Sequence, residues 1–131
     1  MTPEQFIERV KQKLEHITGL PVGRNVLPDG NTRLAQHISV HKLRLAPAEK
    51  QDFPGAPKTL EFLVRLVGKD KSQACDAVME PFASAIISQL TEAALDYACP
   101  ALSFVELRYV IDGDDRACVP LELVFVATLQ A

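Results

Sequence analysis

The residues best suited to chemistry in this chain are three histidines, three cysteines and one cluster of aspartates. His37 and His41 fall in a segment with the alternation of a β-strand. A strand rises about 3.3 Å per residue, so the two lie roughly 13 Å apart. That separation is too great for both to bind one metal ion. We therefore interpret these two, and His16, as surface histidines.

The three cysteines do not form a recognisable pattern. Cys75, Cys99 and Cys118 are odd in number and have no CxxC spacing, which argues against a disulfide framework and against a zinc site. We expect the three cysteines to be mostly buried, reduced thiols, and we expect the protein to reside in the cytoplasm.

The aspartates Asp112, Asp114 and Asp115 resemble the opening of a calcium loop. An EF-hand that began at Asp112 would need glycine at position 117 and glutamate at 123, where this chain has Ala117 and Leu123. We interpret the cluster as a solvated hairpin turn. Weak divalent-ion binding, or a charged contact with a neighbouring protein, is the alternative.

One basic run departs from the acidic average of the chain: Arg33, His37, His41, Lys42 and Arg44. A solvated strand face explains it, and so does an electrostatic contact with an acidic neighbour or with DNA. Aromatic residues make up 6% of the chain and tryptophan is absent, which disfavours a stacking platform for single strands. Our candidate partner contacts are Arg33, His37, Lys42, Arg44, Asp112, Asp114 and Asp115.

No local motif indicates catalysis. The six glycines are scattered singly, so no phosphate-binding loop is present, and no serine–histidine or cysteine–histidine pattern stands out. We expect no catalytic residues, no cofactor and no metal, and we predict that the protein is not an enzyme. A site assembled from distant residues stays open as an alternative.

Length and composition predict one domain spanning residues 1–131. The chain has 131 residues, 47% hydrophobic content and a formal net charge of −3. Such a charge does not favour nucleic acid or an anionic membrane. No apolar run approaches the roughly 18 residues of a membrane span, and the first residues lack the blocks of a signal peptide.

The first half of the chain predicts one helix and two strands. Thr2, Pro3 and Gln5 form a capping signature before an apolar stripe, and Gly19 ends the helix. Residues 33–45 predict a strand whose apolar residues change parity before Leu43, which indicates a bulge or a departure from the sheet. Residues 46–58 form a loop, and 59–67 alternate strongly as a second strand.

The second half predicts a helix and a hairpin. The helix begins near Asp70 or Ser72, reaches about Tyr97, and should be kinked or split at Pro81. Its expected buried side is Ala74, Val78, Phe82, Ala85, Ile86 and Leu90. Strands over 102–111 and 117–129 follow. On the first strand we place Val105, Leu107, Tyr109 and Ile111 on one face, and Pro120 suggests a sheet edge in the second strand, or a strand that starts just after it.

This α-β-β-α-β-β order predicts an α+β domain, with helices packed on an antiparallel or mixed sheet. The features that follow Thr59 are the most distinctive: an alternating strand, a helix with an internal proline, and a hairpin with an acid-rich turn. Together with the amphipathic first helix, they resemble the tail terminator (tail completion, minor tail) proteins of long-tailed bacteriophages, of which phage lambda is the prototype. The basic segment 33–45 departs from that pattern.

The resemblance implies a structural protein made in the bacterial host cytoplasm and, where the prophage is functional, present in the virion tail. Members of that family close the tail tube as a hexameric ring, stop its polymerisation and offer a docking surface to the head–tail connector. The implied partners are other copies of this chain, the tail tube protein and the connector, with no membrane and no sequence-specific nucleic acid. Such a chain can be a monomer when free. The principal alternative is a small cytoplasmic ligand- or protein-binding α+β module; a small enzyme and a DNA-binding dimer are the others.

Overall fold

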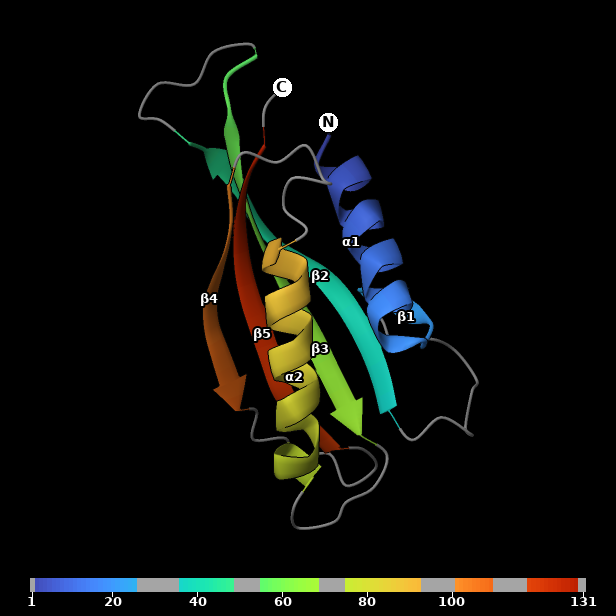
Figure 1. Ribbon diagram of the computed structural model, residues 1–131. Helices are drawn as coiled ribbons and strands as arrows, with labels where there is room; N and C mark the ends of the chain where they lie inside the picture. The colour runs from blue at the N-terminus through green and yellow to red at the C-terminus, as the bar shows by residue number, and fades with distance from the viewer. Residues whose placement is uncertain are drawn as a thin grey trace.

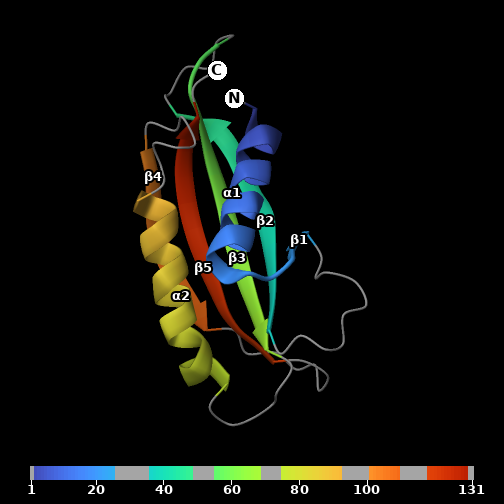
Figure 2. The same cartoon turned by 45° about the vertical axis from the view of Figure 1, so that its right-hand side comes forward.

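The computed structural model describes residues 2–25, 36–48, 55–68, 75–92, 101–109 and 118–129. Within these ranges two helices lie on one face of a five-stranded sheet, as Figures 1 and 2 show. The strand order across the sheet is β1-β2-β3-β5-β4. The α+β class is confirmed, and the sheet is mixed because β1 pairs parallel with β2 while the other pairs are antiparallel.

Helix α1 (Pro3–Thr18) follows from its capping residues. The Thr2 hydroxyl accepts a hydrogen bond from the backbone N–H of Gln5, and the Gln5 side chain accepts one from the N–H of Thr2. At the other end, Gly19 has a φ of 69°, and its N–H donates to the carbonyl of Glu15. Only glycine adopts that conformation without strain, so the helix ends there. Its buried residues are Phe6, Ile7, Val10 and Leu14.

Strand β1 (Val22–Arg24) was not predicted from the sequence. It pairs with residues 38–40 of β2 (Gln36–Pro47) and extends no further. Three residues are too few to give a readable alternation, so only the tertiary pairing defines this strand. Beyond Val40, the described part of β2 has β3 as its single neighbour.

The predicted change of parity in β2 is a β-bulge. Lys42 pairs with Phe62, and Arg44 pairs with Glu61, so Leu43 is the additional residue. Strand β3 (Lys58–Gly68) matches the strand predicted over 59–67. Its even-numbered residues from Leu60 to Leu66 face the helices and are fully buried.

Helix α2 (Cys75–Glu92) is a single helix that includes Pro81, so the predicted split does not occur. Pro81 lies on the exposed side. The buried side is Met79, Ala83, Ile86 and Leu90, at helical spacing. Ala85, which we expected on that side, is exposed. The predicted start near Asp70 or Ser72 and the predicted end near Tyr97 lie outside the described residues.

The C-terminal hairpin is formed by β4 (Ala101–Tyr109) and β5 (Cys118–Leu129). β5 lies centrally, between β3 and β4, and includes Pro120, so the alternative that the strand starts just after this residue is wrong. Pro120 lies where the register between β3 and β5 shifts, a place at which a strand accepts a residue without a backbone N–H. Residue 110, which follows Tyr109 on β4, lies outside the described residues, so a local edge at Pro120 stays a prediction.

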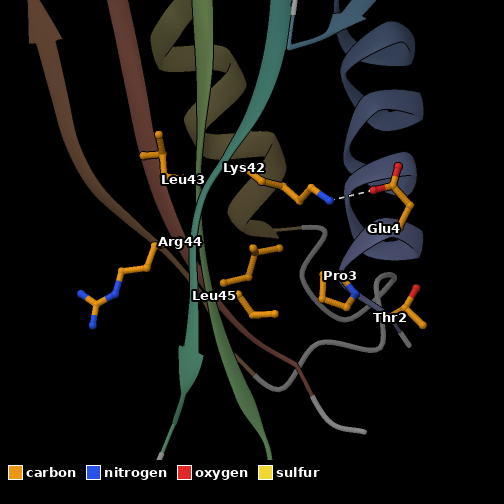
Figure 3. Close-up of a pocket in the computed structure, with 8 residues that line it drawn as sticks. Thr2, Pro3, Glu4, Lys42, Leu43, Arg44 and Leu45 are labelled. Atoms are coloured by element: carbon orange, nitrogen blue, oxygen red, sulfur yellow. Dashed lines mark hydrogen bonds and ion pairs between the residues drawn. The ribbon is translucent and has the colours of Figure 1, made fainter.

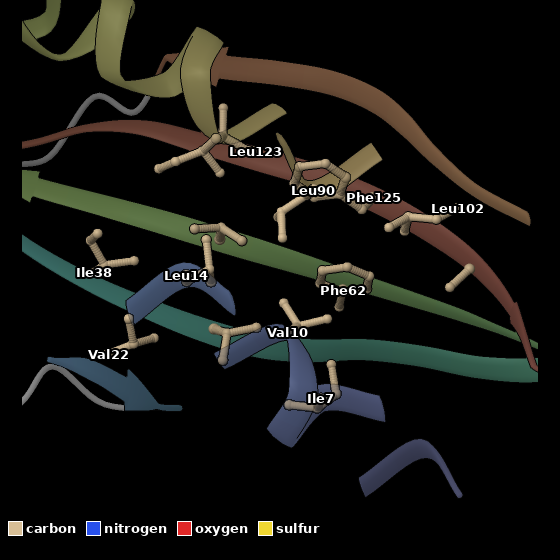
Figure 4. Close-up of a cluster of buried hydrophobic side chains, with 14 of the residues drawn as sticks. Ile7, Val10, Leu14, Val22, Ile38, Phe62, Leu90, Leu102, Leu123 and Phe125 are labelled. Carbon is tan, nitrogen blue, oxygen red and sulfur yellow. The ribbon is translucent and has the colours of Figure 1, made fainter. Parts of the chain in front are cut away.

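A second bulge lies in β4 and corrects our prediction for that strand. Phe104 pairs with Phe125 and Glu106 with Val124, which makes Val105 the additional residue. Leu107 and Tyr109 therefore lie on the helix-covered face, together with Leu102 and Phe104. The prediction that they continue a simple alternation from Val105 is wrong. The core beneath the helices is filled by interlocking apolar side chains, part of which Figure 4 shows. At its centre Phe62 stacks on Phe125 at 5.3 Å, and Phe6 and Phe104 meet these two rings edge-on.

Candidate assembly surface

The basic run of β2 divides between the two sides of the strand. Figure 3 shows Lys42 directed toward α1, whereas Arg44 points away from it. His37 lies in β2 opposite Val67, and Arg44 is exposed opposite Glu61. Arg33 lies outside the described residues, as do Asp112, Asp114 and Asp115. Lys42 and Arg44 therefore do not form one basic patch. A contact between the predicted residues and a partner stays a prediction.

Lys42 is used within the chain. Its Nζ donates to Oε2 of Glu4 at 2.9 Å, and Nη1 of Arg24 donates to Oε1 of Glu4 at 2.6 Å and to Oε1 of Glu8 at 2.7 Å. The hydrogen bond from Arg24, followed by that from Lys42, lowers the pKa of Glu4 to about 2. The same contact raises the pKa of Arg24. These ion pairs connect the start of α1 to β1 and β2.

A hollow of about 430 Å³ lies between the start of α1 and the bulge of β2 (Figure 3). Its lining is Thr2, Pro3, Glu4, Lys42, Leu43, Arg44, Leu45 and Leu60. Arg44 also borders a smaller hollow of about 200 Å³, toward Thr59 and Glu61. The hollow beside the bulge is therefore partly apolar and has charged groups at its rim. It is large enough to receive a side chain.

The sheet face opposite the helices carries a cross-strand ion network. Glu122 of β5 accepts hydrogen bonds from Nε and Nη2 of Arg65 at 3.0 and 2.7 Å, and Nη2 of Arg108 lies 3.5 Å from its other oxygen. The Glu122 side chain is only 13% exposed. The carboxylate is shared by β3 and β4 on either side of it, which ties the three strands together.

Ser39 and His41 lie on the same face of β2, with Oγ and Nε2 2.7 Å apart. Burial lowers the pKa of His41, and Arg65 acts in the same direction while Glu122 opposes it. The pair has the residue types of a nucleophile and a base, but Ser39 is 1% exposed and its hydroxyl cannot meet a substrate. We interpret the contact as one that satisfies a buried hydroxyl.

In the part of the chain that the structure describes, large exposed apolar side chains lie only on β2, beyond its pairing with β1, and on the edge strand β4. Leu43 and Leu45 on β2 are 44% and 49% exposed, and Val105 and Tyr109 on β4 are 53% and 60% exposed. Tyr109 also donates a hydrogen bond to Glu80 of α2. Our sequence reasoning omitted these four residues from the candidate contacts. The parity change before Leu43 was the available signal for two of them.

The described ranges contain no group of three or more histidine, cysteine, aspartate or glutamate side chains placed to hold a metal ion. Neither described helix is long and apolar enough to cross a membrane.

No protein-family model matches this chain, and no curated protein matches it. Among solved structures, the chain is similar to one from the virion of a native gene transfer agent particle. The two are 18% identical with a TM-score of 0.48, and the match covers 98% of this chain and 90% of the other.

Proposed function

We propose that this chain is a structural subunit of a phage-type tail, a terminator that assembles as a ring on the end of the tail tube. It catalyses no reaction. Its partners are other copies of itself, the tail tube protein and the head–tail connector, first in the host cytoplasm and then in the virion tail. The proposal is supported by the resemblance to tail terminators, which covers most of the chain and is best after Thr59, and by the exposed apolar side chains of β2 and β4.

The observation that carries the proposal is the position of these side chains. A closed ring of identical subunits uses head-to-tail contacts, so each subunit needs two different surfaces on opposite sides. β2 and β4 lie on opposite sides of the sheet, and each carries two large apolar residues that are at least 44% exposed. Exposed strands of this kind are suited to contacts with other chains.

A small binding module is the second candidate, favoured by the hollow beside α1. Its apolar lining and its charged rim of Glu4, Lys42 and Arg44 have the mixture that ligand sites use. The two readings differ in one respect: a ligand would protect this hollow alone, whereas ring assembly would bury both edges of the sheet.

Purified tail tubes provide the test. Tubes that grow from tube protein in the presence of this chain should stop at shorter lengths, with one ring of density at the growing end in electron micrographs. Light scattering after size-exclusion chromatography should show a ring-sized species, in solution at high concentration or on tubes. A strict monomer at every concentration, with tubes of unchanged length and bare ends, would contradict the proposal.

A further inference from the structure

The two bulges adjoin the same row of paired residues, one on β2 and one on the edge strand β4. Lys42 pairs with Phe62, Phe62 with Phe125, and Phe125 with Phe104, which makes one row across four strands. Leu43 follows Lys42 along β2, and Val105 follows Phe104 along β4, so each bulge directly adjoins this row, from opposite sides of it. The buried phenylalanine rings between them hold the two edges at a fixed separation of three strand spacings, about 14 Å.

Strand directions permit the two edges to meet in a ring. β2 is antiparallel to β3, and both β3 and β4 are antiparallel to β5, so β2 and β4 run in opposite directions. Rotation about an axis along the strands preserves strand direction and level. In such a ring, the part of β2 beyond its pairing with β1 faces β4 of the next copy as an antiparallel neighbour. Leu43 and Val105 are then offset along the strands by no more than two residues, roughly 7 Å.

The charges at the two bulges are complementary. Arg44 is exposed and forms no ion pair with any described residue. Glu106 is also exposed, and its contact with Arg108 is long, at 3.8 Å between Oε1 and Nε. A carboxylate so loosely held is available to a guanidinium from another copy.

Each bulge also interrupts the edge of its strand, because the additional residue disturbs the spacing of backbone donors and acceptors. Continuous backbone pairing between copies is therefore disfavoured at this level, and side chains must carry the contact. Both additional residues are apolar and exposed, 44% for Leu43 and 53% for Val105. A bulge with an apolar residue at its apex is suited to fitting into a hollow on the facing surface.

We propose that the β4 bulge of one copy docks on the β2 bulge of the next, with Val105 against Leu43 and Leu45 and with Glu106 bonded to Arg44. This rests on the ring proposed above and names the surfaces that form it. The contact is head-to-tail: each copy contributes its β2 edge to one neighbour and its β4 edge to the other.

Two single variants and their mixture test this arrangement. Leu43→Asp places a charge in the proposed contact surface of β2 only, and Val105→Asp places one in that of β4 only. Both positions are exposed, so each variant should fold, which circular dichroism checks. Each variant alone should require at least about a tenfold higher concentration than the wild type to assemble. Ala85→Asp, at an exposed position of α2, is the matched control and should assemble as the wild type does.

An equimolar mixture of the two variants should give a dimer and nothing larger in sedimentation velocity. One intact β4 edge meets one intact β2 edge, and the two spoiled edges that remain repel each other. Arg44→Glu combined with Glu106→Arg in one chain should restore assembly that Arg44→Glu alone weakens.

The failures are distinguishable. If the wild type forms no ring in solution or on tail tubes, the proposed function is wrong, and the proposed interface is wrong as well. If the wild type forms rings and the two aspartate variants form them equally well, the ring stands and this interface is wrong. A homodimer of either variant would also overturn it, because that result requires a contact between identical surfaces.

Discussion

The two faces of the sheet are built from alternate residues of the same strands, yet they are stabilised in different ways. On the covered face of β3, Phe62, Val64 and Leu66 are fully buried beneath two helices. On the opposite face, Leu63 and Val67 are 4% and 1% exposed. Beside them, Arg65 is held by Glu122 of the neighbouring strand.

The difference separates two requirements of the molecule. The covered face forms a core deep enough to hold the fold, and its aromatic row fixes the distance between the edges. The other face combines a thin apolar layer with a charged network in which Glu122 is largely buried while Arg65 and Arg108 stay partly exposed. Such a face keeps the strands aligned through cross-strand pairs rather than through a second core.

Truncating the centre of the covered face should cost most. Phe62→Ala removes a ring that contacts Phe6 and Phe125, and should lower the free energy of unfolding by about 3–5 kcal/mol. Leu63→Ala, on the face without helices (Figures 1 and 2), should cost about 2 kcal/mol, because the surroundings can relax more readily into the space that the side chain leaves. Urea denaturation measures both. Equal losses would show that the opposite face is a second core, against our account.

Neutralising the shared carboxylate should have the next largest effect. Glu122→Gln leaves Arg65 and Arg108 without their anion and should cost about 1–2 kcal/mol in urea denaturation. The matched change Glu106→Gln removes an exposed carboxylate whose contact is 3.8 Å long and should cost less than about 0.5 kcal/mol. Indistinguishable losses in the two variants would mean that the network does not align the strands.

Acidification below neutrality should weaken the sheet through His41. Burial lowers the pKa of His41 in the folded protein below its unfolded value of 6.5. The unfolded chain therefore binds the proton more readily, and the free energy of unfolding falls as pH drops below 6.5 toward the folded pKa. Groups facing the ring are Ser39, Arg65 and Glu122.

His41→Gln should flatten this part of the stability profile between pH 7.5 and 5.5, and His16→Gln on the exposed side of α1 should leave it unchanged. A profile that keeps its slope in the His41 variant would exclude this residue as the cause.

The smallest effect concerns the ion pairs at the start of α1. The pKa of Glu4 is lowered from 4.5 to about 2, so its contribution is complete above pH 4.5 and is lost as pH falls toward 2. Because this carboxylate is exposed, salt should screen the contribution. Glu4→Gln should make acid unfolding less steep in that window at low salt, relative to Glu15→Gln on the same helix. An unchanged acid transition in the Glu4 variant would contradict this.

The sequence predicted those elements whose signals are local. α1 was predicted with its capping residues, because Thr2, Gln5 and Gly19 act within a few residues of one another. The alternation of residues 59–67 was equally clear, and the parity change in β2 revealed its bulge.

Features that depend on distant partners were missed. β1 is defined only by its pairing with β2. The bulge at Val105 gave no signal in the sequence, because simple alternation also places an apolar residue at that position. Arg65 and Glu122 are 57 residues apart, so no local pattern joins them. Lys42 was grouped with a basic patch because its partner Glu4 lies 38 residues earlier. The exposed edge residues became visible as a set only once the strand order was known.

Hydrogen–deuterium exchange on free and assembled protein tests the central claim most directly. If the chain forms a ring through its two sheet edges, assembly should slow exchange of backbone amides in residues 41–47 of β2 and in β4. The exposed side of α2 should exchange equally fast in both states. Protection confined to the helices, or to one edge alone, would contradict a head-to-tail ring built on β2 and β4.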